Sequence, residues 1–224
     1  MYGITQDTKE TAGIQYIPAG INENVKWAGV KFEPLKEGGD PILQYEFEDQ
    51  SGRILSHAVF PVDPETEKKR AQDYPREHKF DNKILGFERG KKVTPDEAVV
   101  KAADDFNRFN KHILNRFCSE EDIIEAQKNV SSYKEFADSV KFLFDNKANK
   151  DQLVRVKVVY RSGRWSSLPP FPPFMEEMEV ENTSLEITDR DVVTKEAPAQ
   201  QDPTEFNPDN FGGDGTDLPD EAGF

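Results

Sequence analysis

The chain has 224 residues, of which 35% are hydrophobic and 32% charged, and its formal net charge is −14. This length is enough for one domain, or two small ones, with a buried core, and no apolar run approaches the ~20 residues of a membrane-spanning helix. A single cysteine, Cys118, excludes an internal disulfide framework, and three histidines leave little for a zinc site. We therefore expect a protein of the reducing cytoplasm that holds no metal and no other cofactor.

The first third of the chain has the pattern of β-strands. Residues 1–18 are polar and are predicted to form a flexible arm. Apolar and polar residues then alternate over 24–35, 42–49 and 53–62, which predicts three strands with short turns and hence an antiparallel meander. The alternation changes phase at Gly29, which predicts a bulge or bend in the first strand.

The centre of the chain has the period of helices. Residues 65–92 carry nine bases against six acids and are expected to be irregular, either as a solvated loop or as a flap over a bound ligand. A capping box that begins at Thr94 opens a helix whose apolar positions recur every three or four residues as far as Phe117. Ser119 caps a shorter helix, and Ser132 opens a third.

The strand period returns after residue 151. Residues 153–161 alternate and predict a fourth strand, and 174–180 and 184–187 are candidates for the last ones. The final 29 residues, 196–224, hold eight acids and no Lys or Arg, together with many Pro, Gly, Asn and Gln residues. Such a composition predicts disorder.

These elements predict a mainly β fold with a helical insertion, of the α+β class. We expect an OB-like five-stranded barrel with its helices between the third and fourth strands, although a β-sandwich or another α+β domain would give a similar pattern. The expected organisation is a flexible N-terminal arm over 1–18, one OB-like domain over 19–190 with an insertion at about 65–150, and a disordered acidic tail over 191–224.

The clearest binding signal lies in residues 153–165, which contain four cations, two aromatic residues and no acid. Single-stranded nucleic acid needs cations along its backbone and flat aromatic faces for its unstacked bases. A solvated outer face over an apolar core gives the same pattern, and that alternative stays open. With the first three strands included, the candidate DNA-binding residues are Lys26, Trp27, Lys31, Tyr45, Arg53, Phe60, Arg155, Lys157, Tyr160, Arg161, Arg164 and Trp165.

The acidic tail is the second signal, because it ends in an aromatic residue at the chain terminus. A disordered acidic segment with a terminal Phe suits capture by a basic, apolar pocket on a partner. The same tail is expected to occupy the protein's own cationic groove before a strand binds. Its candidate partner-binding residues are Leu218, Asp220, Glu221 and Phe224.

Three segments and the tail together resemble one family, the OB-fold single-stranded DNA-binding proteins of bacteriophages. The segments are GINENVKWAGVKFE (Gly20–Glu33), LQYEFEDQSGRI (Leu43–Ile54) and LPPFPPF (Leu168–Phe174). The tip DLPDEAGF resembles the acidic, Phe-terminated tip with which bacterial and phage members recruit replication and repair enzymes. Ala222 and Gly223 stand where the common bacterial tip has Ile-Pro, so the identity of the partner stays open.

With this resemblance, we expect a protein that coats and protects single-stranded DNA in phage DNA replication, recombination and repair in the host cytoplasm. Its tail would recruit a replication protein such as a polymerase, helicase or primase. Self-association into a homo-oligomer is left open, and no membrane partner is expected.

No enzyme is expected. The chain has no GxxxxGK[ST] loop, no GxSxG and no HExxH, and Cys118 has no matched histidine in sequence, so no catalytic residue is assigned. The alternatives are a phage virion or assembly protein, whose acidic body binds other proteins, and an acidic DNA mimic that inhibits a host nucleic-acid enzyme. Both alternatives predict no affinity for oligonucleotides.

Overall fold

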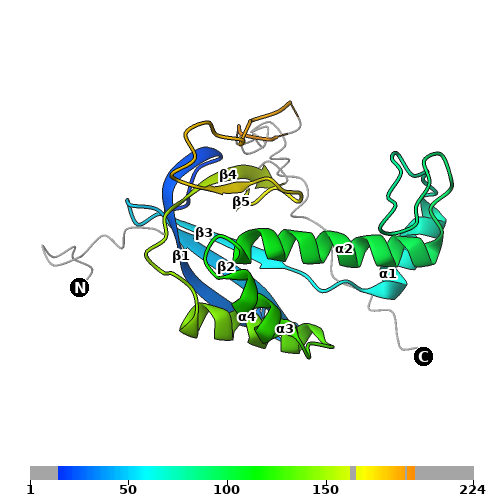
Figure 1. The fold of residues 1–224 in the computed structure, drawn as a ribbon, viewed down its shortest axis with the longest axis horizontal. Coiled ribbons are helices and arrows are strands. Elements are labelled where there is room, and N and C mark those ends of the chain that lie inside the picture. The colour runs from blue at the N-terminus through cyan, green and yellow to red at the C-terminus, as the bar shows by residue number, and fades with distance from the viewer. Residues whose placement is uncertain (1–14, 162–164, 190, 195–224) are drawn as a thin grey trace, which may run out of the picture.

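A computed structural model describes residues 15–161, 165–189 and 191–194. Within them the chain is a mixed α+β protein of six strands and four helices (Figure 1). The helices lie between the third and fourth strands, as the sequence predicts. In chain order the elements are β1 (Gly20–Pro34), β2 (Pro41–Glu48), β3 (Ile54–Val59), α1 (Pro64–Asp73), α2 (Pro95–Leu114), α3 (Glu120–Gln127), α4 (Tyr133–Asn146), β4 (Val154–Arg161), β5 (Trp165–Ser167) and β6 (Met175–Glu177).

The strands form one antiparallel sheet in the order β3-β2-β1-β4-β5, and β6 pairs with β4. The expectation of a closed five-stranded barrel is wrong, because the sheet has a sixth strand and no backbone ladder joins β3 to β5 among the described residues. Strand β5 has only three residues, and it meets β3 through side chains, with Ser167 Oγ 3.0 Å from His57 Nδ1.

Strand β1 bends because it belongs to two pairings. Its first part pairs with β4 and its second part with β2, and the register with β2 shifts between Trp27 and Gly29. A Cβ atom at Gly29 would lie 3.0 Å from Glu46 Oε2, a tight contact that movement of the Glu46 side chain would relieve. The register shift confirms the bulge predicted at Gly29.

The helices begin where their caps predict. Capping boxes at Thr94 and Ser132 open α2 and α4, and Ser119 caps α3. Helix α2 ends at Leu114, three residues before the predicted end. The irregular structure expected after Glu65 is wrong for α1, whose Asp63 side chain accepts a hydrogen bond from the backbone N–H of Glu65 at the first turn.

The core lies between the sheet and the helices and is rich in aromatic rings. Trp27 sits at its centre, with ring centroids 5.8 Å from Tyr45, 5.3 Å from Phe117 and 4.9 Å from Phe144. A residue that precedes β1 also belongs to this core. Ile17, within the predicted N-terminal arm, is fully buried and donates its N–H to the carbonyl of Ile54 at 3.0 Å.

Residues 178–189 and 191–194, here called the C-terminal strap, follow β6 and lie along β4. The strand predicted at 184–187 is wrong, because no backbone hydrogen bonds pair these residues with a strand. Separate side-chain and backbone contacts hold the strap beside β4. Lys157 Nζ donates to the carbonyl of Glu186 at 3.0 Å, and the backbone N–H of Tyr160 donates to the carbonyl of Val192 at 2.7 Å. Most of the predicted arm, residues 1–14, and most of the predicted tail, 195–224, lie outside the described residues.

Candidate nucleic-acid interface

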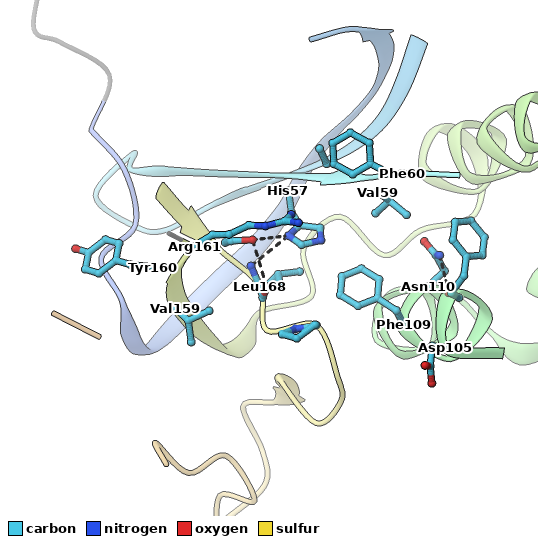
Figure 2. Close-up of a pocket in the computed structure, with 14 residues that line it drawn as sticks. His57, Val59, Phe60, Asp105, Phe109, Asn110, Val159, Tyr160, Arg161 and Leu168 are labelled. Carbon is cyan, nitrogen blue, oxygen red and sulfur yellow. Dashed lines mark hydrogen bonds between the residues drawn. The ribbon is translucent and has the colours of Figure 1, made fainter. Parts of the chain in front are cut away.

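A pocket of about 480 Å³ lies between β3, α2 and the β4–β5 hairpin (Figure 2). Phe60 follows β3 on one side, Phe109 and Asn110 come from α2 on another, and Arg161 comes from the end of β4. Side chains with apolar surface make up most of the lining, and they are Ala58, Val59, Phe60, Phe106, Phe109, Val159, Leu168 and Pro170.

His57 forms a polar part of the pocket wall and is held as a neutral ring. Its Nδ1 lies 3.2 Å from the backbone nitrogen of Leu168. Because that N–H can only donate, Nδ1 is the acceptor and the proton of the neutral ring is on Nε2. Burial, with the charge of Arg161 as a smaller cause, lowers the pKa of His57 to about 3. The ring also stacks on Phe109, with centroids 4.9 Å apart.

The β4–β5 hairpin carries a cation and an indole side by side. Arg161 and Trp165 are direct register partners, and partners across an antiparallel pair point to the same face of the sheet. Trp165 is 70% exposed, and Phe60 at the pocket is 49% exposed. Arg161 is exposed and has no carboxylate within 4.0 Å among the described residues. An exposed guanidinium with no carboxylate partner among the described residues and an exposed phenyl ring therefore line this pocket, and an exposed indole lies across the hairpin from the guanidinium.

Tyr160 offers less exposed ring surface for stacking than the sequence predicts. It lies between Val159 and Arg161 on β4, so its side chain points to the other face of the strand, and Figure 2 shows its ring directed away from Phe109. The side chain is half-buried.

The predicted cations of the first three strands are each paired with a carboxylate. The distances are 3.1 Å for Lys26 to Glu48, 2.6 Å for Lys31 to Glu46, and 2.6 Å for Arg53 to Asp49. Glu46 and Glu48 lie on β2 beside β1, and this placement neutralises the positive charge of the outer face of the sheet.

Arg155 and Lys157 on β4 bind protein groups instead of facing solvent. Arg155 pairs with Glu176 at 2.6 Å and with Glu23 at 3.0 Å. Lys157 is only 8% exposed and pairs with Asp191 of the C-terminal strap at 3.0 Å. The alternation of β4 placed both cations on a solvated face, but the sequence could not reveal that the strap covers this face.

Glu176 is the most strongly perturbed carboxyl in this network. Burial acts to raise its pKa, but hydrogen bonds from Thr183, Arg155 and Ser184 outweigh burial and lower the pKa to about 2. The carboxylate therefore stays ionised and anchors the strap.

Two of the predicted stacking residues belong to the core. Trp27 is 2% exposed and donates its Nε1–H to the carbonyl of Gly29 at 2.9 Å. Tyr45 is fully buried and donates its hydroxyl hydrogen to Asn110 Oδ1 at 2.9 Å. Their rings cannot meet a base at the surface. Arg164 and the predicted tail residues Leu218, Asp220, Glu221 and Phe224 lie outside the described residues.

Helix α2 supplies pocket residues that strand patterns could not indicate. Phe106 and Phe109 belong to the apolar stripe of the helix, so the sequence predicts them only as core.

Over the described ranges, no three or more His, Cys, Asp or Glu side chains are grouped as a metal site would require. None of the described helices combines the length and the apolar content needed to cross a bilayer. Comparisons with protein-family models, with curated proteins and with solved structures find no match to this chain.

Proposed function

We propose that this chain is a non-catalytic, largely sequence-independent binder of single-stranded DNA, and that the strand contacts the β4–β5 hairpin and the pocket beside it. The observation that carries the proposal is the pair of Arg161 and Trp165 on one face of the hairpin, next to the exposed ring of Phe60. Unstacked bases need flat apolar faces, and the phosphates between them need cations.

The order of the strands supports this placement. An OB-fold is a partly open five-stranded barrel that binds oligonucleotides on its second and third strands and at the loops after its first and fourth strands. The order β3-β2-β1-β4-β5, with a side-chain contact from β3 to β5, is an open variant of that arrangement in our proposal. The β4–β5 hairpin then corresponds to the second of those loops. Because one fold hosts many functions, strand order alone assigns none, and the residues of the hairpin and the pocket carry the assignment.

The pocket favours a base over a charged ligand. Its walls are mainly apolar, and its buried histidine is neutral at physiological pH. A single cation, Arg161, lines it, opposite Asp105 and Asn110 of α2. This arrangement suits an aromatic ring with hydrogen-bonding edges whose phosphate stays outside, near the guanidinium.

The two tryptophans of the chain give a direct test, because one is buried and the other exposed. Adding a thymidylate oligonucleotide of about 30 nucleotides, longer than the ~4–16 nucleotides that one OB fold occupies, should quench tryptophan emission through stacking on Trp165. In Trp165→Phe, the remaining emission of Trp27 should not respond to the oligonucleotide, and Trp27→Phe should keep the whole response.

Two results would contradict this proposal. A wild-type protein that shows neither quenching nor binding at low salt would favour a protein-binding role for the acidic body. Quenching that persists in Trp165→Phe would place the strand elsewhere on the molecule.

The role expected for the tail has its own test. Deletion of residues 196–224 should preserve or strengthen DNA binding and abolish recruitment of a replication protein.

A further inference from the structure

Residues 74–93, here called the lobe, connect α1 to α2 and lie at the end of α2 that points away from the sheet (Figure 1). They form two antiparallel arms instead of an open loop. At the base of the lobe three backbone hydrogen bonds join the arms, from the N–H of His78 to the carbonyl of Lys91 at 2.9 Å, from Gly90 to His78 at 2.9 Å and from Val93 to Arg76 at 2.8 Å. Near the tip, Asn82 and Phe87 exchange two more at 2.9 Å each.

The lobe has a small interior of its own. The rings of His78 and Phe87 stack with centroids 4.5 Å apart, and both residues are less than 10% exposed. His78 Nε2 also lies 3.5 Å from Glu97 Oε2, in the capping box of α2. The lobe therefore has no regular helix or strand, as the sequence predicts, but it has its own packed interior and contacts the start of α2.

Although it has this interior, the lobe leaves large apolar side chains in solvent. Tyr74 is 70% exposed, Phe80 79% and Ile84 96%. Exposed apolar side chains gathered on one segment can form a binding surface, whereas single scattered ones need no explanation. In the lobe, Phe80 and Ile84 lie four residues apart near the tip and both face solvent, while His78 and Phe87 are buried.

The charge of the lobe indicates what that ligand is. The lobe holds six cations against three acids, within a chain whose net charge is −14. Lys91 pairs with Glu88 at 2.7 Å. Among the described residues, the other cations of the lobe have no carboxylate within 4.0 Å, and they are Arg76, Lys79, Lys83, Arg89 and Lys92. A polyanion with accessible flat faces matches both features, and single-stranded nucleic acid has both.

We propose that the lobe is a second contact surface for the same single strand that binds at the β4–β5 hairpin, an inference that rests on the proposed function. Helix α2 separates the two surfaces. From its start at Pro95 to the pocket residue Asp105 it rises by about 15 Å, at ~1.5 Å per residue. A short oligonucleotide then occupies the hairpin alone, and a longer one reaches the lobe as well.

The test compares thymidylate oligonucleotides of about 3 and about 30 nucleotides. At ~3.4 Å per nucleotide the short strand covers about 10 Å, less than the ~15 Å between the surfaces, and the long strand exceeds the ~4–16 nucleotides that one OB fold occupies. In the double variant Phe80→Ala, Ile84→Ala, the Kd for the long strand should rise about fivefold to about a hundredfold, since stacking contributes ~1–3 kcal/mol per base and ~1.4 kcal/mol is tenfold. The Kd for the short strand should not change.

A matched control removes exposed apolar groups elsewhere. Ile124→Ala, Phe142→Ala changes side chains on α3 and α4 that are 62% and 49% exposed and should leave both Kd values unchanged. A second variant, Lys79→Ala, Lys83→Ala, should make the salt dependence of long-strand binding shallower by about 1.4, because each phosphate contact on a single strand contributes ~0.7 to the slope. Thermal unfolding of every variant checks that the fold is retained.

The outcomes separate this inference from the proposed function. If Trp165→Ala weakens binding of both lengths and the Phe80, Ile84 variant weakens neither, the lobe inference is overturned and the proposed function stands. If the wild-type protein binds neither length at low salt, the proposed function is overturned. If the lobe variant raises the Kd for the short strand as much as the Kd for the long one, the two surfaces are not separate as we propose.

Discussion

The sheet and the β4–β5 hairpin use the same residue types in opposite ways. On the sheet, Lys26 and Lys31 are paired with carboxylates and Trp27 is buried. On the hairpin, Arg161 has no partner among the described residues and Trp165 is 70% exposed. The lobe resembles the hairpin in this respect. Lysine, arginine and tryptophan in a strand therefore say little about binding until their neighbours are known.

The difference has a physical cause in strand position. Strands β1 and β2 lie inside the sheet, where neighbouring strands place acids beside cations and helices cover the aromatic face. Strand β5 lies at the edge, and its three residues have a partner on only one side. Of its three side chains, Ser167 is buried, and Trp165 is exposed and can meet a ligand.

The largest expected effect separates the two tryptophans. Trp27→Ala should lower the free energy of unfolding by about 3–5 kcal/mol, because it leaves a large cavity among packed rings. Trp165→Ala should change stability by less than about 0.5 kcal/mol and act on DNA binding instead. Urea denaturation followed by circular dichroism measures the free energy of unfolding of each variant. Equal losses of stability in the two variants would contradict the contrast between a buried and an exposed tryptophan.

Removing the hairpin cation should act on binding and on its neighbour. Arg161→Ala should weaken binding of a single strand by about 1.5–3 kcal/mol, the usual range for hydrogen bonds to charged groups. Since the charge of Arg161 helps to lower the pKa of His57, that pKa should rise in the variant. Titration of the histidine by NMR tests the second effect, and an unchanged pKa would mean that the guanidinium does not face the ring.

Two buried histidines should make stability fall in mild acid. Burial is the main cause that lowers the pKa to about 3 for His57 and about 4 for His112, against ~6.5 in an unfolded chain. Below pH ~6.5 the unfolded chain therefore binds protons that the folded chain does not, and each ring removes up to ~1.4 kcal/mol per pH unit.

His57→Asn isolates one of these rings, because the amide oxygen of Asn can replace the Nδ1 acceptor without titrating. The slope of unfolding free energy against pH between about 5 and 6.5 should fall by about half. Urea unfolding at several pH values measures it, and a slope equal to that of the wild type would show that His57 is protonated in the folded protein.

The smallest effect is expected from the paired cations of the sheet. Lys26→Ala, Lys31→Ala should cost less than about 1 kcal/mol per exposed pair. The variant should also leave the salt dependence of single-strand binding unchanged, because Glu48 and Glu46 already neutralise both amines. A shallower slope would show that DNA displaces these carboxylates, and the contrast between sheet and hairpin would then fail.

The local signals in the sequence predicted much of the fold. The capping boxes at Thr94 and Ser132 and the bulge at Gly29 depend on neighbours in sequence or on the adjacent strand, and all three are confirmed. Helix α1 was missed although Asp63 and Pro64 form a good start, because its highly charged sequence has no buried residue to give a period. Closure of the sheet could not be predicted, since it depends on the length of β5.

The candidate site was only partly accessible from sequence. Composition pointed to Arg161 and Trp165, and the structure brings them together as register partners. Arg155 pairs with carboxylates of β1 and β6, and Lys157 pairs with one of the strap, which the sequence predicts in part as a strand and in part as tail. The pairing of these cations depends on contacts distant in sequence, so it could not be foreseen. The lobe was recognised as basic, but its exposed rings stand out only once its arms are seen to pair.

The most direct test of the account is the salt dependence of binding to a labelled single strand of about 30 nucleotides and to a duplex of the same sequence, followed by fluorescence anisotropy. The account predicts tight binding to the single strand that weakens steeply as salt rises, and much weaker binding to the duplex, whose base faces are stacked. Equal binding to both would contradict the role of the exposed rings, and no binding at low salt would contradict the function itself.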